Sequence, residues 1–315
     1  MTRCRPVRAI RRVALGALML AFLPGVAAAA TLDYTVPPGA NFDLAEFRLW
    51  YPDNAGTFRG IVLLVPGSNG DGRPMAEDPV WQAFATRHGF AILACRITDK
   101  PHDQMFIEDY VDVAQGTGPA ILEAMAALAD RSQHPELAEA PWVSWGMSAG
   151  GQVSYEMAAW RPERTIAFVL NKGGIYYTAM ASQAARRVPG FFFVGETDLA
   201  FRTDIIRGIF SVNRRAGALW ALIEEPGVGH AVNRSRDLGI MFFDDVIPLR
   251  VPAAAAANGR TELRAIDPAS GYYGALDQWT FEPVAETEAP RVPMAWLPTE
   301  RTAVAWQKVR RGEPF

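Results

Sequence analysis

The sequence predicts an α/β fold with a doubly wound, mostly parallel sheet, followed by an irregular C-terminal arm. Two observations carry this prediction. Short runs that are apolar on both faces alternate with longer segments of helical spacing, as strands covered on both faces alternate with crossover helices. After about residue 247 this alternation stops and prolines become frequent.

The expected parallel strands are the short apolar runs. Because their side chains are apolar in both alternating directions, they fit a sheet covered by helices on each face. The runs are 61–65, 90–95, 142–145, 166–170, 191–194 and 219–223. Ahead of them, 32–34 and 47–51 are expected to form an antiparallel edge.

The segments between these strands predict helices. In one of them Ile121, Met125 and Leu128 repeat at helical spacing and define an apolar face. The expected helices are 78–88, 119–130, 148–160, 203–215 and 234–246.

The last part of the chain, 248–315, is expected to be an arm packed on the main domain 31–247. Its three tryptophans, Trp279, Trp296 and Trp306, are too many for a disordered tail. We predict an extended segment that ends in a short helix at 299–310. A separate domain is not expected, because the segment offers little core of its own.

The first 30 residues have the layout of a secretory signal peptide. A basic leader precedes the apolar run 13–23, and Ala28-Ala29-Ala30 offers a small-residue cleavage site before Thr31. The alternative is a membrane anchor, but the run is short for a hydrocarbon layer of about 30 Å. A twin-arginine signal at Arg11-Arg12 fits poorly. The protein is therefore expected to be periplasmic or secreted, with no stable membrane insertion after cleavage.

Removal of this leader changes the formal charge from −3 to −8, because five arginines leave with it. Such an acidic protein is a poor candidate for binding nucleic acid or anionic membranes. Cys95 would then be the remaining cysteine, and its apolar surroundings predict a buried structural thiol. Cys4 precedes the apolar run, so it is not a lipoprotein cysteine. The oligomeric state stays open.

The clearest chemical signal is Gly146-Met147-Ser148-Ala149-Gly150, which matches Gly-x-Ser-x-Gly. An apolar strand leads into it and a helical segment follows, which is the context of a nucleophile elbow. The serine then stands at a helix N-terminus, where backbone N–H groups favour developing negative charge. The alternative is a glycine-rich turn with an idle serine.

An alcohol needs a base to act as a nucleophile. In folds with such an elbow, the acid and then the histidine follow the serine along the chain. Of the four histidines, His230 alone lies after Ser148, on a loop that follows an expected strand. We therefore predict His230 as the general base.

The acid that orients His230 is predicted to be Asp198, in Gly195-Glu196-Thr197-Asp198 just after a strand. The loop would bring its carboxylate to the sheet edge that carries the serine and the histidine. Glu196 is the alternative acid. A second alternative gives Asp198 only a helix-capping role.

A tetrahedral intermediate also needs backbone donors, each worth about 2.7–4 kcal/mol. We expect the N–H of Ala149 and the N–H of Ser68, with Asn69 as the alternative to Ser68. The glycine-rich loop 66–72 has no lysine, which argues against a Walker-type phosphate loop.

Substrate contacts are predicted for Asn69, Trp145 and Tyr176, the last two as walls of an acyl or aromatic pocket. For each aromatic residue, core packing is the competing interpretation. Lys172 follows the same strand as Tyr176. It is interpreted as a solvated loop lysine, with a substrate carboxylate as the other possible partner.

These motifs resemble the α/β-hydrolase superfamily. Within it the chain is similar to small esterases grouped with dienelactone hydrolases and polyhydroxybutyrate depolymerase or feruloyl esterase-like proteins. The resemblance covers roughly 44–247 and rests on the elbow, the Gly-x-x-Asp after a strand and the late Gly-His. Where many relatives have His-Gly, this chain has Pro66-Gly67. The segment 99–116 would partly cover the site.

The resemblance implies an ester hydrolase that forms an acyl-enzyme on Ser148 and uses no metal or cofactor. Its substrate would be a small or oligomeric ester. Two alternatives stay open, a peptidase or amidase with the same triad and a non-catalytic binding protein that keeps the fold.

Overall fold

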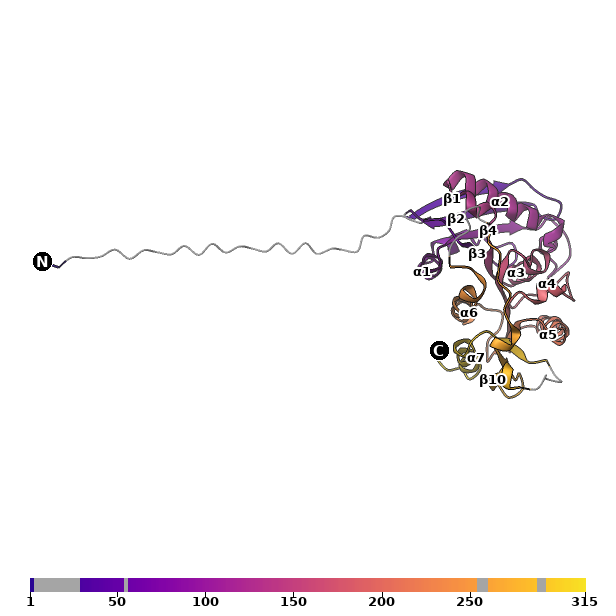
Figure 1. Cartoon of the computed structure of the whole chain (residues 1–315). Helices are drawn as coiled ribbons and strands as arrows, with labels where there is room; N and C mark the ends of the chain where they lie inside the picture. The colour runs from indigo at the N-terminus through magenta and orange to yellow at the C-terminus, as the bar shows by residue number, and fades with distance from the viewer. Residues whose placement is uncertain (3–28, 54–55, 254–259, 288–292) are drawn as a thin grey trace.

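The computed structural model describes residues 1–2, 29–53, 56–253, 260–287 and 293–315. Its centre is an eight-stranded sheet with the order β1-β2-β4-β3-β5-β6-β7-β8 (Figure 1). The strands are β1 Ala29–Val36, β2 Leu44–Pro52, β3 Gly60–Val65, β4 Phe90–Thr98, β5 Trp142–Met147, β6 Thr165–Asn171, β7 Gly190–Gly195 and β8 Trp220–Glu225.

All the expected strands are present, with ends that differ from the expected ones by at most three residues. From β4 to β8 the neighbours pair in parallel, whereas β1 and β2 form the antiparallel edge. The central strands are buried along their length except at Met147, the last residue of β5, which explains why they are apolar on both faces. This is a doubly wound α/β fold with a mostly parallel sheet.

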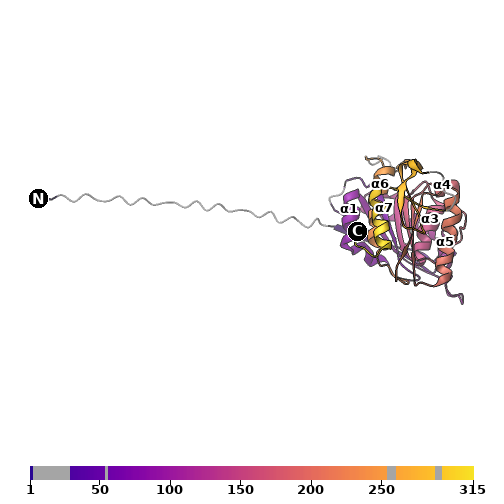
Figure 2. The ribbon, with the colours of Figure 1, turned by 90° about the horizontal axis from the view of Figure 1, so that it is seen from below.

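Helices cover both faces of the sheet. Figure 2 shows α6 and α7 on one side and α3, α4 and α5 on the other. The bounds are α1 Pro79–His88, α2 Thr117–Ser132, α3 Ala149–Trp160, α4 Gln183–Arg186, α5 Ala200–Arg215, α6 Ser235–Arg250 and α7 Glu300–Arg310. All the predicted helices are present, and α4 is an addition.

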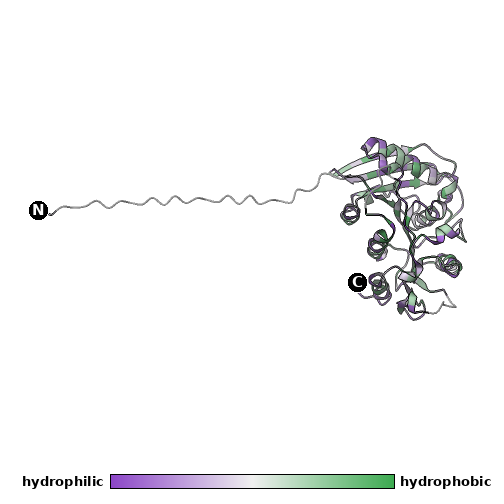
Figure 3. Ribbon diagram, in the orientation of Figure 1, coloured by the Kyte–Doolittle hydropathy of each residue, from purple (hydrophilic) through white to green (hydrophobic). Residues whose placement is uncertain are grey.

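The core is divided between the two faces of the sheet. One cluster packs α1, α6 and α7 against one face, and two others pack α2, α3 and α5 against the opposite face. Successive residues of a strand therefore enter different clusters, as Phe191 and Phe192 do. Figure 3 shows the apolar strands between helices with polar outer sides.

The C-terminal arm has more regular structure than predicted. It forms an antiparallel sheet in the order β10-β9-β11, from β9 Tyr272–Gly274, β10 Phe281–Pro283 and β11 Ala295–Leu297. Trp296 and Trp306 are fully buried in the same core cluster as α6. These large side chains join the core on one face of the main sheet, so the arm packs on the main domain.

The predicted leader lies mostly outside the described residues. Ala29 and Ala30 are the first residues of β1 and pair with Pro52 and Tyr51. Cleavage before Thr31 would therefore shorten β1 by these two residues. Among the described residues, no helix has the length and apolar character needed to cross a membrane.

Candidate functional site

Ser148 occupies a strained turn between β5 and α3. Its backbone has φ 56° and ψ −124°, and its N–H donates to Asn171 O over 2.8 Å. Left-handed φ values are uncommon for a serine and cost energy that the surrounding structure must offset. The turn presents a half-buried serine at the N-terminus of α3, as the elbow motif predicts.

The elbow glycines are required by close backbone approach. A Cβ on Gly150 would overlap the carbonyl oxygens of Val65 and Pro66, and a Cβ on Gly146 would overlap the backbone of Gly150. The helix that follows the serine can therefore approach the end of β3 only because these positions lack side chains.

His230 and Asp198 are hydrogen-bonded. His230 Nδ1 lies 2.8 Å from Asp198 Oδ2. The Asp198 side chain is 3 % exposed and that of His230 is 30 % exposed. Asp198 also accepts from the N–H of Leu199 over 2.7 Å. This bond fixes the imidazole with Nε2 free for chemistry.

Glu196 has a different partner. Its side chain accepts from the N–H of Gly227 over 2.6 Å and ties the loop after β7 to the loop after β8. Of the two acids considered from the sequence, Asp198 alone contacts His230 in the structure.

Sequence reasoning missed Arg202, on the first turn of α5. Its Nη1 lies 3.1 Å from Asp198 Oδ1 and 3.4 Å from His230 Nδ1. Burial opposes ionisation of Asp198, but hydrogen bonds from His230, Leu199 and Arg202 outweigh it, so the pKa of Asp198 is lowered. The four-residue spacing between Asp198 and Arg202 is the sequence pattern that could have indicated this ion pair.

The three predicted catalytic residues follow β5, β7 and β8, so their loops emerge at the same carboxyl edge of the parallel sheet. The described residues include no hydrogen bond between the Ser148 hydroxyl and His230. Such contacts are often long in unliganded enzymes and shorten when substrate binds.

Backbone strain is concentrated at this edge. Seven non-glycine residues of the described chain have positive φ, and five of them lie in its loops. These five are Asn69, Phe106, Ser148, Lys172 and Asn233. Strained backbone persists where surrounding contacts determine it, and such sites are typically functional.

The loop after β3 lies beside the elbow, where an oxyanion hole is expected. A Cβ on Gly67 would be 3.7 Å from the Cβ of Ser148. Among the described residues, the N–H groups of Ser68 and Ala149 donate to no protein acceptor. Asn69 holds the loop, since its Oδ1 accepts from Asp99 N–H over 2.8 Å and its Nδ2 donates to Ser68 Oγ over 3.3 Å.

The two aromatic residues predicted to contact substrate lie in or against the core. Trp145 is 3 % exposed, and its indole N–H donates to Ser235 O over 3.2 Å. The pocket role predicted for it is wrong, because its side chain is buried on the face of the sheet that α6 covers. Tyr176 packs edge-to-face on Tyr155 with ring centroids 5.5 Å apart.

Lys172 is not the solvated lysine that the sequence favoured. It is fully buried and forms an ion pair with Glu225. Burial lowers its pKa against the opposing effect of Glu225. Cys95, in contrast, is the buried thiol that was expected, and burial raises its pKa to about 12.

The segment 99–116 contacts the start of α5, next to Asp198, through Phe106. Phe106 packs on Phe201, with ring centroids 5.6 Å apart, and the guanidinium of Arg202 lies 5.3 Å from the Phe106 ring centre. The segment is also tied to the loop after β3 through Asp99 and Asn69. It therefore borders the site on the side of α5.

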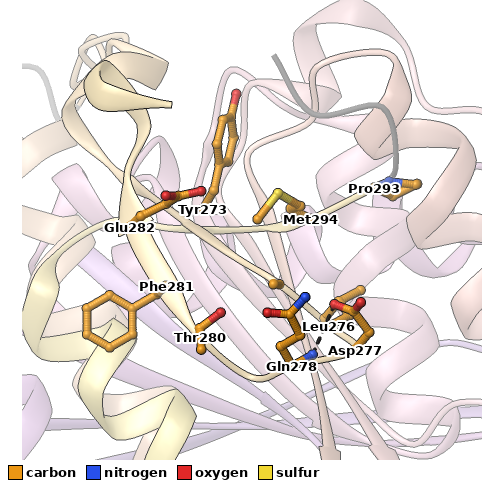
Figure 4. Close-up of a pocket in the computed structure, with 10 residues that line it drawn as sticks. Tyr273, Leu276, Asp277, Gln278, Thr280, Phe281, Glu282, Pro293 and Met294 are labelled. Atoms are coloured by element: carbon orange, nitrogen blue, oxygen red, sulfur yellow. Dashed lines mark hydrogen bonds between the residues drawn. The ribbon is translucent and has the colours of Figure 1, made fainter. Parts of the chain in front are cut away.

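A large cavity of about 680 Å³ lies elsewhere, in the arm (Figure 4). Its walls include Tyr273, Leu276 and Met294, and none of the three predicted catalytic residues. Among the described residues, no group of three or more histidine, cysteine or acidic side chains is placed to hold a metal ion.

No protein-family model and no curated protein matches the chain. Several solved structures share its backbone arrangement. A poly(aspartic acid) hydrolase-1 from Sphingomonas sp. KT-1 is 12 % identical with a TM-score of 0.49, and the match covers 67 % of this chain and 97 % of that one.

Two further structures match to a similar extent. A ferulic acid esterase is 13 % identical, with 68 % of this chain and 95 % of that one covered and a TM-score of 0.49. An esterase PE8 is 16 % identical, with 63 % and 97 % covered and a TM-score of 0.48. At such identities the likeness concerns the fold, so function has to be inferred from this chain's own side chains.

Proposed function

We propose that this protein is a serine hydrolase that cleaves carboxylic esters through an acyl-enzyme on Ser148. The observation that carries the proposal is the His230 Nδ1–Asp198 Oδ2 bond of 2.8 Å, at the sheet edge where the strained elbow presents Ser148. A nucleophile, a base and an orienting acid at one edge form the arrangement needed for acyl transfer.

In the first step Ser148 Oγ attacks the acyl carbon while His230 Nε2 takes the hydroxyl proton. The tetrahedral intermediate collapses, the acyl–oxygen bond breaks, and the alcohol leaves with the proton from His230. Asp198 stabilises the imidazolium during this step. Because the pKa of Asp198 is lowered, its carboxylate stays ionised at neutral pH.

In the second step water attacks the acyl-enzyme while His230 takes a proton from it. The second tetrahedral intermediate releases the carboxylic acid and returns the proton to Ser148 Oγ. The N–H groups of Ser68 and Ala149 are the proposed donors to both oxyanions, because neither has a protein acceptor among the described residues. Each such donor is worth about 2.7–4 kcal/mol.

Apolar side chains around the triad support an ester with an apolar group. Leu199, Phe201, Val232 and Phe106 are all exposed large hydrophobic residues, and all lie on loops or helix ends at this edge. Exposed apolar groups that gather at one place typically mark a binding surface. We propose that they receive the acyl or alcohol part of the substrate.

Export is part of the proposal and rests on the basic leader, the apolar run and the small-residue site before Thr31. The protein would then act in the periplasm or outside the cell. Expression of the full chain with N-terminal sequencing of the exported product tests this. A mature N-terminus at or near residue 31 is expected, and retention of the leader in the cytoplasm would contradict it.

Matched nitrophenyl esters and nitroanilides test the reaction. We expect ester turnover that exceeds anilide turnover, a preference for apolar over charged acyl groups, and loss of both in Ser148→Ala. Anilide turnover equal to ester turnover would favour a peptidase or amidase. Turnover that persists in Ser148→Ala would show that another residue is the nucleophile.

A further inference from the structure

We propose that the buried ion pair Lys172–Glu225 positions the loop 226–234, and with it His230, relative to the elbow. The proposal rests on the proposed function, because it assigns a role in the geometry of the same site. It gives Lys172 and Glu225 the status of positioning residues, since neither contacts the reacting atoms.

Lys172 directly follows β6 and is hydrogen-bonded through both its side chain and its backbone. Its side chain is fully buried, and its Nζ donates to Asn171 Oδ1 over 3.0 Å and to Glu225 Oε2. Its N–H donates to Phe193 O on β7 over 2.9 Å. Its backbone has the left-handed φ of 52°, an unfavourable conformation that these contacts maintain.

Glu225 connects this lysine to the loop 226–234, here called the histidine loop. Its Oε1 accepts from Asn233 Nδ2 and from the N–H of Arg234, both over 3.0 Å. These two residues end the loop on the side that leads into α6. One carboxylate therefore binds the lysine with one oxygen and the loop with the other.

The other end of the loop is held by the loop that follows β7 and carries Asp198, here called the acid loop. Thr197 N–H donates to Val228 O over 3.0 Å, two residues before His230. The loop is thus fixed on both sides of the histidine, at Val228 by the acid loop and at Asn233 by Glu225.

The same ion pair is connected to the nucleophile. Asn171, the neighbour of Lys172, accepts the Ser148 N–H over 2.8 Å. A chain of direct contacts therefore runs from Ser148 through Asn171 and Lys172 to Glu225, and from there to the histidine loop.

Gly195 on β7 lies between Lys172 and Glu225, and its lack of a side chain leaves room for their ion pair. β6 and β8 are separated by β7, whose Gly195 pairs with Glu225. A Cβ on Gly195 would lie 3.0 Å from Lys172 Cε and 2.6 Å from Gly229 O. The absence of a side chain there lets the lysine reach under β7 while the histidine loop closes over it.

Stability alone is a poor reason for such a pair. Taking two charges out of water costs about as much as their attraction returns, so buried ion pairs are often replaced by apolar residues without loss. An ion pair instead fixes the relative orientation of its two side chains, because its hydrogen bonds form in only one arrangement of them. Positioning is the role that fits a pair located below three catalytic loops.

The test compares Lys172→Met, Glu225→Gln and the double variant with a matched control, Arg250→Met. Arg250 is a second buried cation, at the opposite end of β6, and donates to Thr165 O over 2.6 Å and Ile166 O over 2.8 Å. Each variant is assayed for kcat and KM on a nitrophenyl ester, for thermal unfolding, and for amide hydrogen exchange in 226–234.

Lys172→Met is expected to lower kcat by about 10- to 100-fold with KM changed less than about threefold, because misplacement by 1 Å costs about that much. Hydrogen exchange in 226–234 should rise. The double variant should recover part of kcat, since it removes the unpaired charge and keeps an acceptor for Asn233 and Arg234. Arg250→Met should lower Tm and leave kcat and this exchange unchanged.

Variants that unfold at a lower temperature but keep wild-type kcat and wild-type exchange in 226–234 would overturn the proposal. Should Lys172→Met fail to fold, Glu225→Gln carries the same test with a nearly isosteric change. If the wild-type protein hydrolyses no ester, the proposed function fails, and hydrogen exchange still decides whether the ion pair orders the loop.

Discussion

Asp198 and Glu196 lie two residues apart on one loop, yet their carboxylates have different tasks. Asp198 is almost fully buried against His230, whereas Glu196 holds the N–H of Gly227. Asp198→Asn is expected to lower kcat about 10⁴-fold, because an amide favours the wrong tautomer of the histidine. Glu196→Gln keeps an acceptor for the N–H of Gly227 and should lower kcat far less. Steady-state kinetics on one ester decides this, and equal losses in both variants would contradict the assignment.

Alanine substitutions at two helix glycines are predicted to have opposite effects on stability. Gly150→Ala should prevent folding or abolish activity, since its Cβ would overlap backbone oxygens of β3 and the following turn. Gly208→Ala should stabilise the protein by about 1 kcal/mol. This exposed residue of α5 has no atom within 4 Å of a Cβ added there.

Chemical denaturation of both variants measures these effects. An active, stable Gly150→Ala protein would contradict the close approach of α3 to β3. A destabilised Gly208→Ala protein would contradict the position of Gly208 on the outer side of α5.

Asp244 connects helices α1 and α6. Its carboxylate lies 2.8 Å from Arg87 Nη2 and 2.6 Å from His88 Nε2. Burial raises its pKa, and the hydrogen bonds from His88 and Arg87 lower it by more, so the net shift is downward. A lowered folded-state pKa gives stability that is present above the unfolded value of about 3.9 and is lost as pH falls through the folded value.

Asp244→Asn should therefore lower Tm at pH 7, by roughly 2–4 °C for each kcal/mol lost. The difference from wild type should shrink below about pH 4. Asp237→Asn, an exposed acid on the same helix, is the matched control and should change Tm little. A constant difference from pH 7 to pH 3 would contradict the ionic nature of this connection.

At the scale of the whole molecule, the arm belongs to the folding unit of the sheet. Trp306 on α7 is fully buried, and its indole N–H donates to Leu222 O on β8 over 2.8 Å. Trp306→Ala should cost about 3–5 kcal/mol of unfolding free energy. Val304→Ala on the exposed side of α7 should cost less than about 0.5 kcal/mol. Urea unfolding compares them, and a second, independent transition for the arm would contradict this view.

The strands and helices of the main domain could be predicted because covered parallel strands are apolar on both faces. The arm sheet could not, since its strands have three residues each and show no periodicity. Asp198 and His230 could be predicted because, in folds with a serine elbow, the acid and then the histidine follow the serine along the chain. The burial of Lys172 and Trp145 depends on contacts with β8 and α6, which are distant in sequence.

The central claim is that Ser148 is a nucleophile activated by His230. Treatment of the purified protein with a fluorophosphonate, followed by peptide mass spectrometry, tests it most directly. We expect one adduct, on Ser148, and much slower labelling in His230→Ala at equal folded concentration. An adduct on another serine, or no adduct on the folded wild-type protein, would contradict the account.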